Sequence, residues 1–235
     1  MRHLRLTSFL VFFFLTHLAS GQIKQINPDK IVQSLGETYM KDKRAVGLSI
    51  GVYINGTNYF YNYGTIEKGK TQKPTQNTVY EIGSVTKVFV SLILANAVIE
   101  KKVKLDDDIR KYLDGNYPNL EYKKKPITLL HLSNTTSGIP NWLPVFTKEI
   151  TNVSPDSTCY LIEKVYRNYT DKDIFKALHN IVLDTVPGSK NSHSNGAALL
   201  LTYILEKVYK TSIENLVSRY IVSVSKKIVN ILTIN

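Results

Sequence analysis

The sequence predicts an α+β protein in which an N-terminal β-hairpin of an antiparallel sheet precedes a long helical region. Two observations support this fold class. Apolar and polar residues partly alternate over residues 45–64, on both sides of Asn55-Gly56, and this dipeptide is the strongest short-range signal for a hairpin turn. Beyond residue 80, apolar residues recur mainly at helical spacing, with no convincing strand before residue 221.

The first part of the chain predicts one helix and two strands. Asn27 followed by Pro28 is a typical helix start, and apolar residues then recur at helical spacing, which predicts an amphipathic helix over 28–41. The hairpin strands are predicted over 46–54 and 57–63. The apolar positions of the predicted helix are Ile31, Val32, Leu35 and Tyr39.

The helical region opens with an apolar series over residues 85–100 that is typical of a buried helix. Residues 105–113 predict a short helix, because acids stand in its first turn, where the helix dipole favours negative charge. Residues 114–170 predict an irregular stretch, since proline recurs throughout it. The prolines of this stretch are Pro118, Pro126, Pro140, Pro144 and Pro155.

Two later helices carry recognisable start signals. Thr170 with Asp173 resembles a variant capping box, and Thr211 with Glu214 forms a full capping box. The last residues also predict one short strand. The first of these helices opens at Thr170 and reaches about residue 180, and the second covers 212–221. Between them, a buried helix is predicted over 195–209. The strand is predicted over 227–234.

The N-terminus predicts a secretory signal peptide over residues 1–21. Arg2 and Arg5 form a basic start, residues 6–18 form an apolar run, and Ala19-Ser20-Gly21 supplies the small residues that a signal peptidase reads. The run is too short to span a bilayer as a helix. We therefore expect cleavage near Gly21 and a periplasmic or secreted protein with no stable membrane anchor. The alternative is an uncleaved membrane anchor.

The chain is strongly basic. Its formal net charge of +11 falls to +9 without residues 1–21, because that segment holds two arginines and no acid. A basic surface favours anionic partners such as cell-wall polymers, lipid headgroups or nucleic acid, and the simpler interpretation is a set of solvated lysines. Export argues against a nucleic-acid partner. The hypothesis that the protein binds the cell wall or a membrane is supported by this charge alone.

Cofactor chemistry has no support in the sequence. Cys159 is the single cysteine, so a disulfide scaffold and a thiolate metal site are excluded by count, and we expect it to be a small buried side chain. The five histidines show no metal-ligand spacing, and no glycine-rich phosphate loop is present. We therefore expect neither a metal nor a nucleotide.

Ser84 and Lys87 are the candidate catalytic pair. A serine hydroxyl is a weak nucleophile that needs a base, and residues three apart on a helix share one face, so Lys87 can bring its amine to Ser84. The start of a helix also favours developing negative charge. The spacing alone is a weak signal, since a helix-capping serine beside a surface lysine would show the same pattern.

Three segments in order resemble the serine β-lactamase-related family, which includes class C β-lactamases, D-alanyl-D-alanine carboxypeptidases and esterases. They are "YEIGSVTKVFVSLILANAVIEKKVKLDDDIRKYL" (80–113), "PITLLHLSNTTSGIP" (126–140) and "PGSKNSHSNGAALLLTYILEKVY" (187–209). The resemblance covers roughly residues 45–221. It implies a β-lactamase/transpeptidase-like fold, with Ser84 as nucleophile and Lys87 as base.

The third segment carries two further residues that the resemblance implies to be functional. The family has Tyr-x-Asn here, and this chain has His193-Ser194-Asn195. Histidine side chains ionise nearer to neutral pH than tyrosine, so His193 is expected to replace the tyrosine in proton transfer, with a hydrogen-bonding loop histidine as the alternative. Asn195 is expected to bind and orient the substrate. In the second segment, Thr135 stands where the family usually has histidine.

The resemblance stops after Tyr220. Family members continue with strands that complete the sheet, one of which carries a Lys-Thr-Gly or His-x-Gly motif, and "VSVSKKIVNILTIN" does not resemble that continuation. The expected organisation is a signal peptide over 1–21, an incomplete hydrolase domain over 22–221 whose C-terminal strands are missing, and an atypical tail over 222–235.

The implied function is that of an exported serine hydrolase that forms an acyl-enzyme on amide or ester bonds. The implied substrates are small molecules or peptides, namely D-amino-acid peptides, peptidoglycan stems, β-lactams or small esters, with no cofactor. The alternative is a catalytically inactive fragment or a non-catalytic binding module, because losing even one oxyanion donor typically costs about 10²–10³ in rate.

Overall fold

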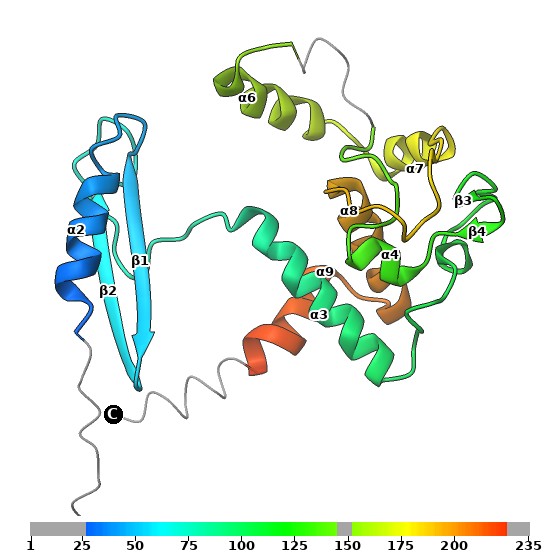
Figure 1. Ribbon diagram of the computed structural model, residues 1–235, viewed down its shortest axis with the longest axis horizontal. Helices are drawn as coiled ribbons and strands as arrows, with labels where there is room; N and C mark the ends of the chain where they lie inside the picture. The colour runs from blue at the N-terminus through cyan, green and yellow to red at the C-terminus, as the bar shows by residue number, and fades with distance from the viewer. Residues whose placement is uncertain (1–26, 145–151, 225–235) are drawn as a thin grey trace, which may run out of the picture. The chain divides into compact units, whose positions relative to one another are not determined.

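The structure, a computed structural model, describes residues 27–144 and 152–224 (Figure 1). It divides into two compact units, the first ending at Glu81 and the second beginning at Ile82. Among the described residues, a hairpin with one helix makes up the first unit, and the second is helical apart from one very short strand pair, so the predicted α+β class is confirmed. The predicted signal peptide and the strand over 227–234 lie outside the described residues.

The hairpin forms where the sequence predicts it. Strands β1 (Gly47–Ile54) and β2 (Thr57–Gly64) pair antiparallel, and Ile54 lies opposite Thr57. Asn55 and Gly56 between them have φ of 48° and 84°. Two positive φ values are what a two-residue turn of the favoured type requires, and Asn-Gly adopts them with little strain.

Helix α2 (Asp29–Tyr39) packs on β2 through a small residue, not through the predicted apolar face. Gly36 is buried, and a Cβ placed there would lie 2.4 Å from the Tyr63 ring. The Tyr63 hydroxyl donates a hydrogen bond of 3.3 Å to the Val32 carbonyl. The close approach turns three of the four apolar positions outward, which corrects the sequence interpretation. The exposed positions are Ile31, Leu35 and Tyr39.

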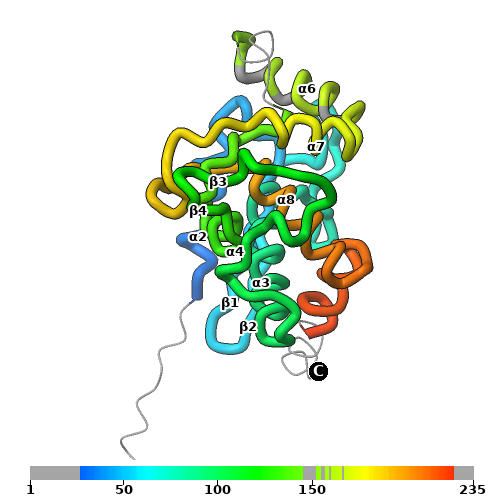
Figure 2. The backbone as a smooth tube through the Cα atoms, turned by 90° about the vertical axis from the view of Figure 1, so that its right-hand side faces the viewer, coloured from blue at the N-terminus to red at the C-terminus, as the bar shows by residue number. Residues whose placement is uncertain are grey.

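The second unit is organised around three packed helices, α3 (Thr86–Ile99), α4 (Leu129–Ser133) and α8 (Asn195–Tyr209). They lie side by side in Figure 2. A hydrogen bond of 2.9 Å between the hydroxyls of Ser133 and Ser91 also joins α4 to α3. The helical core residues that are buried include Ile93, Leu94, Ala97, Leu129, Leu132, Ala197, Leu200, Leu201, Ile204 and Leu205.

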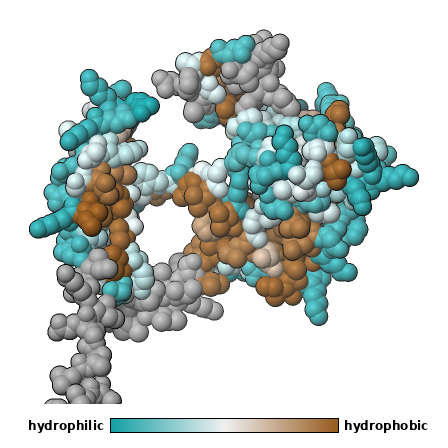
Figure 3. Space-filling model, in the orientation of Figure 1, coloured by the Kyte–Doolittle hydropathy of each residue, from teal (hydrophilic) through white to brown (hydrophobic). Residues whose placement is uncertain are grey.

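Helix α3 buries one side of its apolar series in the core of the second unit, and its other side is exposed. Val90, Ile93, Leu94 and Ala97 face the core. On the other side Val88 is 64% exposed, and apolar side chains gather over α3 and α9 (Ile213–Val217) in Figure 3. Within the described residues, then, one side of α3 contributes to the core.

In its described residues, 114–144 and 152–170, the stretch predicted to be irregular contains two helices, α4 and α6 (Pro155–Tyr166). Pro155 does not break α6 but begins it, because proline lacks only an N–H that has no partner in the first turn. The pair of two-residue strands β3 (Glu121–Tyr122) and β4 (Lys125–Pro126) also lies in this stretch. The side chain of Cys159 is outside what the structure describes.

The predicted helix over 105–113 reduces to the 3₁₀ turn η2 (Ile109–Tyr112). The acids that favoured a helix instead bind nearby backbone: Asp107 accepts from the N–H of Lys104 at 2.7 Å, and Asp108 accepts from the N–H of Arg110 at 2.9 Å. Such local side-chain hydrogen bonds compete with helix formation. The three hydrogen bonds to Asp107, from the Lys111 amine, the Lys104 N–H and the Tyr112 hydroxyl, lower its pKa to about 2.

Start signals of the later helices are partly confirmed. Thr170 and Asp173 form the predicted capping box of α7 (Asp171–His179). Helix α9 is capped by Ser212 and not by Thr211, and it ends at Val217, where π-helical turns η3 (Ser218–Val222) follow. No helix in residues 27–144 or 152–224 combines the length and apolarity needed to cross a membrane.

The loop before α8 is fixed by the segment that follows α4. The carbonyl of Thr136 accepts from the N–H of Gly188, and the carbonyl of Thr135 accepts from the N–H of Ser192, both at 2.8 Å. Thr135 has φ of 62°. This left-handed conformation is strained for a β-branched residue. The strain is therefore stored at the point where the two segments are joined.

Replacing Thr135 by asparagine should raise the free energy of unfolding by about 1 kcal/mol, because asparagine tolerates a left-handed backbone. Chemical denaturation followed by the fluorescence of Trp142, which lies in the same unit, measures the change. Thr135→Ala is the matched control: it retains a Cβ at positive φ and should gain less. Equal stability of the asparagine variant and the parent would contradict the strain at this position.

Candidate active site

Ser84 stands in the 3₁₀ turn η1 (Gly83–Val85) that leads directly into α3. Gly83 has φ of 52°, a conformation that favours glycine, and this bend turns the chain into the helix. The N–H of Val85 bonds the carbonyl of Ile82 at 3.2 Å. The Ser84 side chain is exposed, so its hydroxyl is accessible to a molecule from solvent.

Lys87 lies in the first turn of α3, on the same face as Ser84. Its Nζ donates a hydrogen bond of 3.0 Å to Ser84 Oγ. The lysine is partly buried, and this burial lowers its pKa, because the ammonium is less well solvated than in water. The ion pairs among the described residues do not include Lys87. A smaller energy therefore separates its charged form from the neutral amine.

Asn195 is the first residue of α8, and it is 108 residues from Lys87 in the sequence. Packing of α8 on α3 brings the two together, and Lys87 Nζ donates a hydrogen bond of 2.6 Å to Asn195 Oδ1. The amine therefore bonds both Ser84 and Asn195. Three of the four residues singled out in the sequence meet at one point.

The fourth residue, His193, precedes α8 by two positions and is exposed. In the part of the chain that the structure describes, no hydrogen bond joins His193 to Ser84, Lys87 or Asn195. Its role in proton transfer stays a prediction from sequence.

The start of α8 is held by residues that the sequence did not indicate. The N–H of Asn195 donates to Asn141 Oδ1 at 3.1 Å, and the N–H of Gly196 donates to the Asn141 carbonyl at 3.0 Å. The first N–H groups of a helix have no partner within it, so Asn141 satisfies two of them. Ser194, the N-cap, accepts from the N–H of Ala197 at 2.9 Å and donates to the Pro140 carbonyl at 2.9 Å.

Gly196 makes this close contact possible. A Cβ at this position would lie 2.9 Å from the Pro140 carbonyl oxygen and 2.9 Å from Leu143 Cγ. Any larger residue would push the segment away from α8 and stretch the hydrogen bonds to Asn141. The sequence holds no local signal for this contact, because Asn141 and Asn195 are 54 residues apart.

The arrangement provides a hydroxyl, an amine whose pKa is lowered and an amide oxygen that orients the amine. These groups suit nucleophilic attack by serine with lysine as general base. Among the described residues, no group of three or more His, Cys, Asp or Glu side chains is placed to hold a metal ion.

Comparisons with known proteins point to one family. A family model described as "Beta-lactamase" matches residues 32–224. A β-lactamase of Pseudomonas fluorescens is 37% identical over 110 residues, which cover 46% of this chain and 30% of that protein. Protein flp of Staphylococcus aureus strain N315 is 30% identical over 200 residues, which cover 84% of this chain and 36% of that protein.

Solved structures show the same fold as this chain. The β-lactamase/D-alanine carboxypeptidase from Yersinia pestis superposes with a TM-score of 0.68 at 27% identity, covering 83% of this chain and 52% of that one. The chain thus spans about a third of the length of those two curated relatives and about half of this solved chain. The chain belongs to the serine β-lactamase-related family, with its β-lactamase/transpeptidase-like fold.

Proposed function

We propose that the protein is an exported serine hydrolase that cleaves amide or ester bonds through an acyl-enzyme. Its substrates would be D-amino-acid peptides, peptidoglycan stems, β-lactams or small esters. The observation that carries the proposal is the position of Lys87 Nζ, 3.0 Å from Ser84 Oγ and 2.6 Å from Asn195 Oδ1. Family membership supports the same reaction class.

Acylation follows from the hydrogen bonds of the amine. As a neutral amine, Lys87 has two N–H bonds and one lone pair. Asn195 Oδ1 can only accept, so it holds one N–H and leaves the lone pair for the Ser84 hydroxyl. Lys87 then takes the proton of Ser84 as Oγ attacks the substrate carbonyl carbon. The tetrahedral intermediate collapses to an ester on Ser84, and the leaving group departs with the proton that Lys87 took from Ser84, delivered through His193.

Deacylation uses the same groups, with water attacking in place of the leaving group. Water replaces the leaving group, a base takes its proton, and attack on the ester carbonyl releases the acid and restores the Ser84 hydroxyl. The Ser84 N–H is proposed as one oxyanion donor, and Asn195 as a contact for the substrate. For His193 we retain the predicted role of protonating the leaving group.

Export and domain organisation rest on sequence patterns. We propose that residues 1–21 are a signal peptide cleaved near Gly21, that residues 22–221 form the hydrolase domain, and that residues 222–235 form a separate tail. The basic n-region and the short apolar run support the signal peptide. The protein would then act in the periplasm or outside the cell.

Covalent labelling tests the nucleophile and the base. The full chain should react with a fluorescent penicillin or a fluorophosphonate, and Ser84→Ala should abolish the label. Lys87→Ala should slow labelling by about 10²-fold or more, because the general base is lost. Ser91→Ala, which removes another hydroxyl on α3, is the matched control and should label at the parental rate.

Two results would count against this proposal. Folded protein that takes up neither label would support the alternative, a non-catalytic binding module. Unchanged labelling of Lys87→Ala would show that Lys87 is not the base for Ser84.

The labelling rate should depend on the ionisation of Lys87. Burial lowers its pKa, so the neutral amine is populated at a lower pH than in a free lysine. The rate should rise with pH and level off below the ordinary lysine pKa of ~10.4. Lys87→Arg stays protonated and should label slowly at every pH. A plateau in the parent only above the ordinary lysine value would contradict the effect of burial.

Asn141 is proposed as a positioning residue that acts through Asn195. Asn141→Ala removes the side-chain acceptor of the Asn195 N–H, and we expect labelling to slow about tenfold with a stability loss of about 1 kcal/mol. Asn141→Asp retains an acceptor and adds a negative charge two hydrogen bonds from Lys87. It should therefore restore the plateau rate but move the plateau to higher pH, because a nearby anion raises the pKa of an amine.

A purely structural role of Asn141 predicts a different response of the two variants to pH. Both variants would then change the amount of folded protein without moving the pH at which labelling reaches its plateau.

A further inference from the structure

His131 is a partly buried histidine that the proposed reaction does not use. It is the third residue of α4, and its Nδ1 accepts a hydrogen bond of 3.1 Å from the N–H of Thr128, the residue before the helix. Glutamate or glutamine usually has this role in a capping box. A histidine can fill it only as the neutral ring that carries its proton on Nε2, because the protonated ring has two donors and no acceptor.

The ring also lies against the loop 180–194, which leads from α7 into α8. A Cβ placed on Gly188 of this loop would lie 2.9 Å from Nε2 and 3.4 Å from Cδ2 of His131, so no side chain fits between them. Gly188 has φ of 92°, which favours glycine. The ring of His131 therefore contacts two segments that are far apart in the sequence, the start of α4 and this loop.

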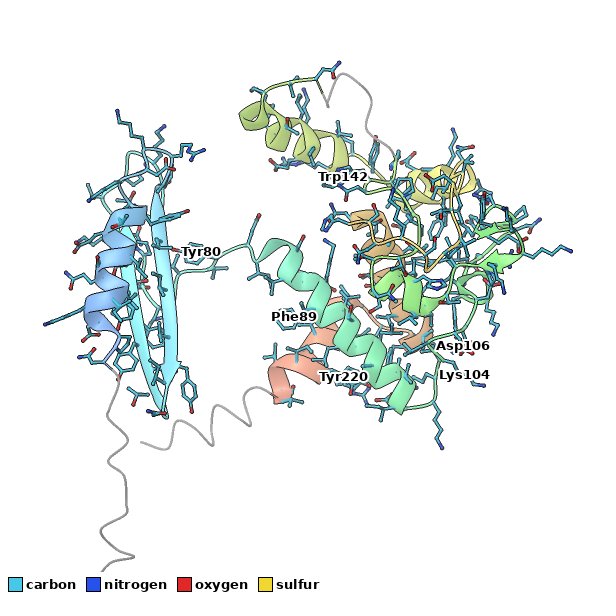
Figure 4. All side chains as sticks on the ribbon, in the orientation of Figure 1. Tyr80, Phe89, Lys104, Asp106, Trp142 and Tyr220 are labelled. Carbon is cyan, nitrogen blue, oxygen red and sulfur yellow. The ribbon has the colours of Figure 1, made fainter. Side chains whose placement is uncertain are left out.

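Backbone hydrogen bonds complete the contact. The N–H of Gly188 donates to the carbonyl of Thr136, and the N–H of Thr136 donates to the carbonyl of His131 at 3.0 Å. The loop is thus tied to α4 at both ends, through the ring of His131 at its start and through Thr136 beyond its last residue. Trp142, later in the same segment, lies beside the start of α8 in Figure 4.

The loop leads directly to residues proposed to act in the reaction. The N–H of Ser192 donates to the Thr135 carbonyl at 2.8 Å, and His193 and Asn195 follow within three positions. We infer that His131 is a positioning residue for the proposed acyl transfer: its neutral ring holds this loop, and with it His193 and Asn195, in place, and protonation of the ring releases the loop. The inference rests on the proposed function for its effect on the reaction, and on the contacts alone for its effect on the loop.

Few charges surround the ring of His131. The turn before α4 holds Asp107 and Asp108, whose carboxylates bind Lys111 and Arg110. In the part of the chain that the structure describes, the ring forms no hydrogen bond with a charged side chain. Burial lowers its pKa, because the charged ring is less well solvated there than in water. The charged side chains and histidines of the loop, α3 and α8 are Asp184, Lys190, His193, Lys87, Glu206 and Lys207.

The direction of the pH effect follows from this pKa. The folded value lies below the ordinary histidine value of ~6.5, so between the two values the unfolded chain binds a proton that the folded chain does not. The free energy of unfolding should therefore fall as the pH drops through this window, and His131 should add no pH dependence above it. His131→Gln retains an acceptor for the Thr128 N–H and does not titrate, so it should lose this part of the acid sensitivity.

The rate of covalent labelling tests the positioning role. Below its folded pKa, His131 should slow labelling further by about tenfold per pH unit, in addition to the effect of Lys87. The quotient of the rates of the parent and His131→Gln, each per folded protein, cancels Lys87 and should fall only below pH ~6.5. His131→Ala has no acceptor and should label about tenfold more slowly than His131→Gln at every pH. His179→Gln, which removes an exposed histidine of α7, is the matched control and should retain the parental profile.

Hydrogen exchange reports on the loop without any reaction. In the Ser84→Ala variant, NMR follows protonation of the His131 ring together with exchange of the Gly188 and Ser192 N–H groups, corrected for the intrinsic effect of pH. Both groups should exchange at least about tenfold faster once the ring is protonated, because their hydrogen bonds open with the loop. This measurement needs no substitution of His131, so it remains decisive where those variants do not fold.

The two proposals can fail separately. Faster exchange at low pH without covalent labelling of the folded parent would overturn the hydrolase and leave the link between His131 and the loop intact. Covalent labelling with a quotient that stays constant on both sides of the His131 pKa would overturn the positioning role, since a merely structural histidine changes the amount of folded protein and not this quotient. Exchange of the Gly188 and Ser192 N–H groups that does not respond to protonation of the ring would overturn it as well.

Discussion

The contact between α3 and α8 is the constraint on which the site depends. Apolar packing of the two helices places the first turn of α3 beside the first residue of α8, and the hydrogen bond of 2.6 Å from Lys87 to Asn195 results. A partly buried ammonium needs a hydrogen-bond acceptor, because burial without one is costly. An amide oxygen supplies the acceptor without supplying charge. The lysine is therefore oriented while its pKa still falls, whereas a carboxylate at this position would raise it.

The same contact requires the segment after α4 to hold the start of α8 in place. Asn195 can meet Lys87 only if the start of α8 is fixed, and that start is fixed by Asn141, Pro140 and the N-cap Ser194. Gly196 is needed because any side chain there would collide with the segment. The geometry at Ser84 thus depends on residues that do not touch it, and the strained Thr135 lies in the same segment.

Features that arise from neighbours in sequence could be predicted, and features that arise from packing could not. Asn55-Gly56 and the Thr170–Asp173 capping box act over a few residues, and both are confirmed. The spacing of Ser84 and Lys87 is local too, and the hydrogen bond between them is present. The apolar face of α2 was predicted wrongly, because amphipathic spacing shows where apolar residues lie and not which of them find a partner.

The missed residues of the site have the same explanation. Asn141 carries no motif, and its importance arises from hydrogen bonds with the start of α8, 54 residues later in the chain. Local patterns also misled where two polar residues competed: Ser212, not Thr211, caps α9. His193 was singled out by its place in a segment that resembles the family, and such a resemblance fixes a position in the chain but not the direction of a side chain.

Acylation and complete turnover need different groups of this chain. Acylation needs a nucleophile and a base, and the residues proposed for both lie in the unit that begins at Ile82. Both steps need oxyanion donors, and turnover needs in addition a positioned water. A covalent label, which requires acylation alone, therefore reports on the groups whose geometry is described, and steady-state hydrolysis reports on everything else.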